Sequence, residues 1–166
     1  IKACNEAKAY GFAAVPVFSQ WISLVAECLS GTNIKPQVTV GFPSGGVSTK
    51  SKVAETEAGI ADGAREVDMV LNIGKLLGGE YDFVRSDIKA VVDAAKAHNV
   101  GVKVIMEVGF LTDDLKKKAA ELSIEAGAEF IKTCTGFGPG KATVHDIMLL
   151  KEFVGDKIKI KASGGV

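Results

Sequence analysis

Three segments of this 166-residue chain place an ionisable side chain where a buried strand should be apolar. Asp68 lies inside the run EVDMV, Lys132 ends the run FIK, and Lys161 ends the run IKIK. A carboxylate in an apolar strand is costly to bury unless it has a partner. If the ends of these strands converge, the two lysines and the aspartate can form a single site.

Two lysines beside a carboxylate suit an enzyme that forms an imine with its substrate. A lysine amine is nucleophilic only when it is neutral, and its ordinary pKa of about 10.4 keeps it charged at neutral pH. Burial and a second nearby cation both lower the pKa of a lysine. The neutral amine can attack an aldehyde, while Asp68 moves the protons directly or through water. This chemistry needs no metal and no cofactor. The alternative is that each lysine reaches solvent along its aliphatic stem or is merely paired.

The segments that must position these residues alternate between short β-branched runs and longer amphipathic stretches. Strands are predicted at 13–17, 37–40, 66–70, 101–106, 130–132 and 158–161. Helices are predicted between them at 20–29, 49–62, 83–98, 113–126 and 144–154, and residues 1–10 have a helical pattern as well. Four of these helices are preceded by residues that favour N-caps, namely Ser19, Ser48, Thr112 and Thr143.

A strand and a helix that recur about every 30 residues are typical of a parallel α/β fold. An open doubly wound sheet is favoured by a glycine-rich loop after the first strand, but this chain has PVFS at 16–19. Polar residues at the ends of several strands favour a (β/α)8 TIM barrel. With about six of eight strands, residues 1–166 are expected to form a single barrel domain that lacks its first and last strands. The two free sheet edges are expected to promote association with a second copy, a homo-oligomer.

The composition excludes several classes of protein. Hydrophobic residues make up 47% and charged residues 24%, which excludes disorder as the main state. Twenty Lys and Arg balance twenty Asp and Glu, which gives no support to a nucleic-acid or anionic-membrane surface. No apolar run approaches the roughly 18 residues of a membrane span. Three cysteines without metal-ligand spacing predict neither a disulfide framework nor a zinc site, and a cytoplasmic location is expected.

Three segments also resemble, in the same order, the signature segments of the deoxyribose-phosphate aldolase family. They are EVDMV at 66–70, FIKTCTG at 130–136 and KASGGV at 161–166, with weaker support from VGFP at 40–43 and VIME at 104–107. The resemblance covers essentially the whole chain. It implies a (β/α)8 barrel that reversibly cleaves 2-deoxy-D-ribose 5-phosphate to acetaldehyde and D-glyceraldehyde 3-phosphate. By position, Lys132 matches the imine-forming lysine, Lys161 the second lysine that activates it, and Asp68 the acid/base residue.

Glycines that follow two of the strands are candidates for holding the substrate phosphate. Gly164 and Gly165 come directly after the strand of Lys161, and Gly136 follows Thr135. Backbone N–H groups in such loops bind anions in many barrels. The alternative for any such glycine is a plain turn. Thr135 is a weaker candidate for binding the substrate.

The chain departs from the resemblance at several positions. The family's first strand, with its aspartate-histidine-threonine segment, and its serine-containing phosphate loop are expected outside residues 1–166. Pro16 and Phe18 stand where the family usually has cysteine and asparagine or tyrosine, and Phe137 stands where some members have lysine. The family's substrate contacts from the strand of Pro16 are therefore not expected to carry over unchanged.

Other residues receive simpler interpretations. Glu107 is expected either to hydrogen-bond the lysine pair or to close a helix cap. Cys134 is expected to be a small core filler rather than a nucleophile. Trp21 and Phe12 are expected to pack between the helices and the barrel, and Lys116–Lys118 to form a solvated helix face.

Three functions remain open from the sequence. The first is a deoxyribose-phosphate aldolase, and the second is another Schiff-base sugar-phosphate aldolase, for example one similar to a transaldolase. The third is a catalytically inactive barrel fragment or a binding module that keeps the pocket without the chemistry. The expected partner in the first two is a small phosphorylated sugar, with neither nucleic acid nor membrane involved.

Overall fold

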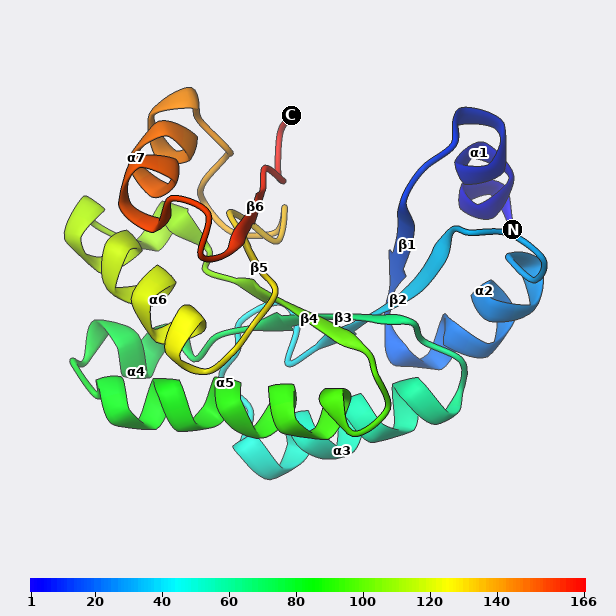
Figure 1. Ribbon diagram of the computed structural model, residues 1–166, viewed down its shortest axis with the longest axis horizontal. Coiled ribbons are helices and arrows are strands. Elements are labelled where there is room, and N and C mark those ends of the chain that lie inside the picture. Colours follow the sequence, from blue (N-terminus) through cyan, green and yellow to red (C-terminus); the bar gives the residue numbers. More distant parts are fainter.

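The computed structural model describes residues 1–166 and contains one sheet of six parallel strands. The strands lie side by side in sequence order: β1 (Ala14–Val17), β2 (Lys35–Val40), β3 (Glu66–Val70), β4 (Gly101–Ile105), β5 (Phe130–Lys132) and β6 (Lys159–Lys161). Figure 1 shows a curved, open trough with β1 and β6 at its two edges. This order and curvature are those of a (β/α) barrel. The predicted fold class, an incomplete (β/α)8 barrel, is confirmed.

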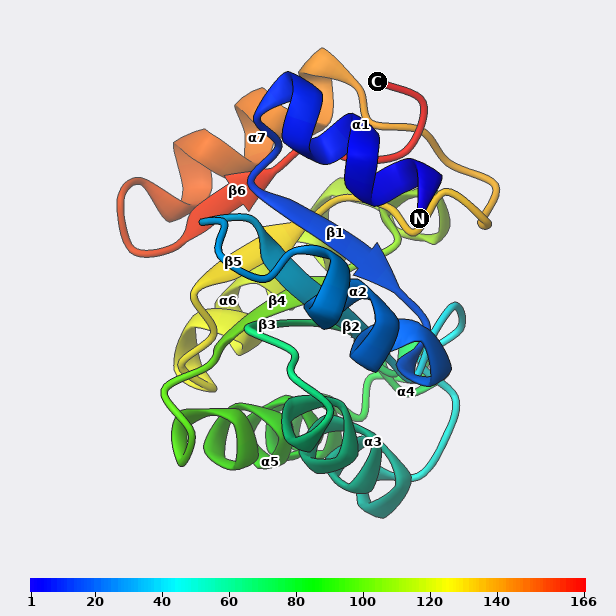
Figure 2. The same cartoon turned by 90° about the vertical axis from the view of Figure 1, so that its right-hand side faces the viewer.

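Helices cover the outer side of the trough. The main ones are α1 (Lys2–Tyr10), α2 (Ile22–Cys28), α3 (Thr49–Ala61), α5 (Tyr81–Lys96), α6 (Asp113–Glu125) and α7 (Val144–Val154). Figure 2 shows α1 and α2 nearest the viewer, on either side of β1. Helix α4 (Ile73–Leu77) was not predicted, because its five residues are too short for a periodic pattern. No helix has the length and apolar character needed to cross a membrane.

Three of the four predicted N-caps are confirmed. The side chains of Ser48, Thr112 and Thr143 each accept a hydrogen bond from the backbone N–H three residues further on. The prediction for Ser19 is wrong, because Ser19 begins the 3₁₀ turn η1 (Ser19–Trp21) and caps no helix. Its hydroxyl donates instead to Glu55 of α3, 3.3 Å away.

The two faces of the sheet differ in chemistry because side chains alternate along each strand. The outward-facing residues, such as Val38, Val67 and Val104, pack under the helices in a cluster of 31 buried apolar residues. Several inward-facing residues of the central strands are polar and are nevertheless buried: Gln37, Thr39, Glu66, Asp68, Lys103 and Lys132. The interior of the trough is therefore a polar compartment that must supply its own hydrogen-bond partners.

A buried ion pair fastens the helices beneath the carboxyl end of β3. The Nζ atom of Lys52 on α3 lies 2.5 Å from Oδ2 of Asp87 on α5 and donates to the carbonyl of Val70 at 2.9 Å. Both charged side chains are fully buried. Burial lowers the pKa of Lys52, and its contacts with Asp87 only partly oppose this. The pair anchors the strand that carries Asp68.

Candidate active site

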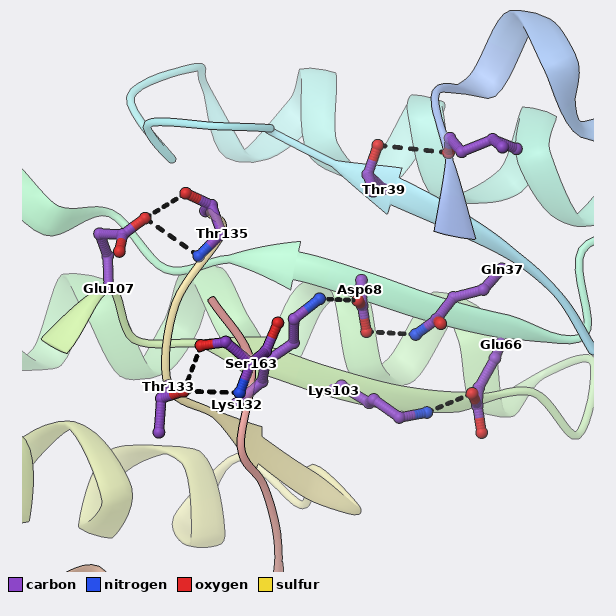
Figure 3. A network of polar contacts seen from close by, with 11 residues as sticks. Gln37, Thr39, Glu66, Asp68, Lys103, Glu107, Lys132, Thr133, Thr135 and Ser163 are labelled. Atoms are coloured by element: carbon purple, nitrogen blue, oxygen red, sulfur yellow. Dashed lines mark hydrogen bonds and ion pairs between the residues drawn. The ribbon is translucent and has the colours of Figure 1, made fainter. Parts of the chain in front are cut away.

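Asp68 of β3 lies in the polar interior between one partner on the neighbouring β2 and another on β5, two strands away (Figure 3). The Nζ atom of Lys132 on β5 is 2.6 Å from Oδ2 of Asp68, and Nε2 of Gln37 on β2 donates to Oδ1. The Asp68 side chain is fully buried, and that of Lys132 is 6% exposed. A buried charge is tolerated when it is paired in this way. The structure thus brings Asp68, in the middle of β3, together with Lys132 at the carboxyl end of β5.

Lys161 lies beside Lys132 on the neighbouring strand. The backbone register pairs these two residues, and adjacent strands are about 4.8 Å apart. Burial lowers the pKa of Lys161, and the charges of Lys132 and Lys103 lower it further, while the Asp68 carboxylate acts in the opposite direction. The three predicted catalytic residues therefore share one electrostatic environment, and Lys161 holds its proton less strongly than a lysine in water.

Residues just beyond Lys132 join the ends of β5 and β6. The Thr133 hydroxyl donates to the carbonyl of Ser163 at 2.8 Å and accepts from its N–H at 3.0 Å. Cys134 is fully buried, and burial raises the pKa of its thiol, with the Glu107 carboxylate acting in the same direction. A protonated, enclosed thiol is a poor nucleophile, which fits the interpretation of Cys134 as core filler.

A pocket of about 320 Å³ opens onto Lys132. Two threonines, Thr39 and Thr135, line it together with this lysine, and the remaining wall is apolar: Pro16, Val17, Phe18, Trp21, Phe42 and Phe137. Neither Asp68 nor Lys161 belongs to the lining. Lys132 is therefore the charged side chain that a ligand entering the pocket meets.

The three predicted phosphate-binding glycines come together at the carboxyl ends of β5 and β6. A Cβ atom added to Gly164 would lie 3.7 Å from the backbone N of Gly136, so the two loops nearly touch. Gly164 and Gly165 have φ values of 89° and 71°, which a side chain would strain. None of the three glycine N–H groups donates a hydrogen bond within the protein. Backbone donors left unpaired in this way are available to an anion.

Glu107 has a role that differs from both sequence interpretations. Its Oε2 atom accepts hydrogen bonds from the N–H of Thr135, at 3.1 Å, and from the Thr135 hydroxyl (Figure 3). The same hydroxyl oxygen accepts from the N–H of Phe137 at 3.0 Å. Glu107 itself has a φ of 54°, in the left-handed region, which costs about 1–2 kcal/mol for a residue with a side chain. Glu107 therefore contacts neither lysine and instead holds the loop that presents Gly136.

Comparison with known proteins identifies the family. The model of the DeoC/LacD family aldolases matches residues 1–166. The chain belongs to this family. It is 51% identical over 163 residues to deoxyribose-phosphate aldolase 1 of Bacillus licheniformis, which covers 98% of this chain and 73% of the relative. It is 48% identical over 166 residues to the deoxyribose-phosphate aldolase of Caldanaerobacter subterraneus, with 99% of this chain and 72% of the relative covered.

Solved structures give the same assignment. The structure titled "QR15, an Aldolase" superposes with a TM-score of 0.94 at 35% identity, covering 99% of this chain and 73% of that one. The deoxyribose phosphate aldolase of Aeropyrum pernix, described as tetrameric, superposes with a TM-score of 0.88 at 26% identity. The match covers 98% of this chain and 68% of that one.

A second group of buried charges lies next to this site, beginning with Glu66 two residues before Asp68 on β3, and was not predicted. Glu66 forms ion pairs with Lys103 and, at 3.0 Å, with Lys35. The Nζ atom of Lys103 also lies 4.6 Å from the centre of the Phe130 ring. Burial raises the pKa of Glu66, but the hydrogen bonds and charges of Lys103 and Lys35 outweigh it and the net pKa is lowered. A signal was present in the sequence, because Lys103 interrupts the run GVKVI just as Asp68 interrupts EVDMV.

The aromatic wall of the pocket beside Lys132 was also not predicted. The expectation that Trp21 and Phe12 pack between helices and barrel is wrong, since each is 50% exposed. Trp21 ends a 3₁₀ turn and lines the pocket. The ring of Phe42 packs edge-on against Phe18 at 5.8 Å and against Phe137 at 5.5 Å. These contacts join residues from three strand ends, which no local pattern in the sequence indicates.

Proposed function

We propose that this chain cleaves 2-deoxy-D-ribose 5-phosphate reversibly into acetaldehyde and D-glyceraldehyde 3-phosphate through an imine on Lys132. The observation that carries the proposal is the position of Lys132, which is paired with Asp68 and is the one charged residue lining the pocket. Relatives 48–51% identical to this chain are named deoxyribose-phosphate aldolases, which supports the choice of substrate.

The residues of the site suit each step of this cleavage. The neutral amine of Lys132 adds to the C1 aldehyde of the open-chain sugar to give a carbinolamine. The carbinolamine takes up a proton from the solvent and loses water, which leaves a protonated imine. Asp68 takes the proton of the C3 hydroxyl, directly or through water, while the C2–C3 bond breaks and its electron pair passes into the imine. Glyceraldehyde 3-phosphate is then released, and the remaining two carbons stay bound to Lys132 as an enamine. Return of the proton to C2 and addition of water release acetaldehyde and restore the amine.

The phosphate of the substrate is assigned to the glycine loops. Thr135 lines the pocket beside Lys132, and Gly136 follows it directly. The unpaired N–H groups of Gly136, Gly164 and Gly165 then act as donors to the phosphate oxygens, and the Thr135 side chain borders the sugar.

Replacing Lys161 with methionine should move the acidic limb of the kcat/KM profile to higher pH by about one unit. Two ammonium groups on adjacent strands repel, and Lys161→Met removes this repulsion. Because the pKa of Lys161 is lowered, its charge is present at acidic pH and fades as the pH rises through that lowered value. The profiles of wild type and Lys161→Met should therefore converge at alkaline pH. If the acidic limb of the kcat/KM profile stays in place in Lys161→Met, Lys161 does not activate Lys132 through its charge.

The function is tested by incubating the full chain with 2-deoxyribose 5-phosphate and measuring both aldehydes. We expect acetaldehyde and glyceraldehyde 3-phosphate in equal amounts, with saturation kinetics. Binding of the sugar phosphate with no release of either aldehyde would instead indicate a binding module. Release of a different pair of aldehydes from another sugar phosphate would indicate a different Schiff-base aldolase.

A further inference from the structure

We propose that Lys141 is the cation that recognises the substrate phosphate and so determines the preference for a phosphorylated sugar. The inference rests on the proposed function and adds a residue to its phosphate site. Lys141 was not singled out in the sequence, because it lies in a loop with no strand or helix periodicity.

The side chain of Lys141 lies directly on the glycine loop. A Cβ atom added to Gly165 would be 2.9 Å from Cδ and 3.0 Å from Cγ of Lys141, closer than side chains pack. The absence of a side chain at residue 165 is therefore what lets the lysine stem lie there. The backbone N–H of Ala142 donates to the carbonyl of Gly164 at 2.8 Å, which fixes the neighbouring residue to the same loop.

The figures show how the chain brings these segments together. In both views the orange segment that leads into α7 runs beside the red segment after β6. The first carries Lys141 and the second carries Gly164 and Gly165. The contact thus joins two loops at the carboxyl end of the barrel, on the same side as the pocket.

The charge of Lys141 is not used by the protein itself. The side chain is exposed and forms no ion pair, whereas Lys132 is paired with Asp68. The Nζ atom lies only two bonds beyond Cδ, so the ammonium group reaches the space next to Gly165. A phosphate monoester carries a charge of about −1.5 to −2 at neutral pH, and neutral backbone N–H groups cannot balance it alone. Phe137, which follows Gly136, adds no charge to the site.

Lys141 should act on binding and not on the chemical step. The phosphate is bonded to C5 of the sugar, whereas the reacting atoms are C1 to C3. An interaction of equal strength in the bound substrate and the transition state changes KM and leaves kcat in place. A charge-assisted hydrogen bond of this kind corresponds to about a ten-fold change in affinity.

The test compares two substrates on the full chain, 2-deoxyribose 5-phosphate and unphosphorylated 2-deoxyribose. For Lys141→Ala, we expect the ratio of the two kcat/KM values to fall about ten-fold, through a higher KM for the phosphorylated sugar. Lys141→Arg should restore most of the ratio because it keeps the charge. Lys157→Ala is the matched control, since Lys157 is an exposed lysine without an ion pair near the opposite end of β6.

A merely structural role of Lys141 would lower kcat/KM for both sugars equally, and that result overturns the proposal, as does an unchanged ratio. Titration with inorganic phosphate, followed by the amide NMR signals of Gly136, Gly164 and Gly165, separates this test from the proposed function. If neither sugar is cleaved but phosphate shifts these signals less in Lys141→Ala than in wild type, the proposed reaction fails and the anion site stands. If phosphate shifts them equally in both proteins, the role of Lys141 fails.

Discussion

Replacing Lys132 with methionine should lower kcat for cleavage of 2-deoxyribose 5-phosphate by about 10⁴-fold or more. No amine then faces the pocket, so no imine forms, and Asp68 loses the cation 2.6 Å from its Oδ2 atom. The rate is measured by the release of acetaldehyde from the full chain.

Because Lys132→Met leaves a buried carboxylate without its cation, loss of folding could imitate loss of chemistry. Lys132→Arg controls for this, since the guanidinium keeps a positive charge for Asp68 but is not a nucleophile. We expect both variants to be inactive and only the methionine variant to lose substantial thermal stability. Activity within a hundred-fold of wild type in Lys132→Arg would contradict the role of the amine.

Asp68→Asn is expected to lower kcat by about 10²- to 10⁴-fold while leaving imine formation partly intact. The amide has the shape of the carboxylate and still accepts the hydrogen bond from Gln37, but it cannot take the proton of the C3 hydroxyl. Turnover and imine formation are measured separately. The first is the rate of acetaldehyde release, and the second is the fraction of Lys132 that borohydride traps with acetaldehyde. A near-normal turnover rate in Asp68→Asn would remove this residue from the mechanism.

Much of the fold follows from local pattern in the sequence. The strands at 66–70 and 130–132 and the helix at 144–154 have the predicted bounds, and the other predicted strands differ by at most two residues at either end. The period of two along the strands also places Asp68, Lys132 and Lys161 on the same, inward face of the sheet. These features were predictable because each depends on residues close together in the chain.

The partners of these residues depend on how distant segments meet, and local pattern does not contain that information. Lys116 shows this most clearly, because the expectation of a solvated face is wrong for it. Its side chain is buried and lies 2.7 Å from Asp146 of α7 and 2.9 Å from Asp113. The contacts of Glu107 with Thr135 and of Lys141 with Gly165 likewise arise only when loops from different strands are brought together.

The most direct test of the account is to trap the imine on the protein. The full chain is mixed with acetaldehyde, reduced with borohydride, digested and mapped by mass spectrometry. The account predicts an added two-carbon group on the Nζ atom of Lys132, with Lys161 unmodified. A two-carbon group on Lys161 with Lys132 unmodified would contradict it, because the lysine that lines the pocket would then not be the nucleophile.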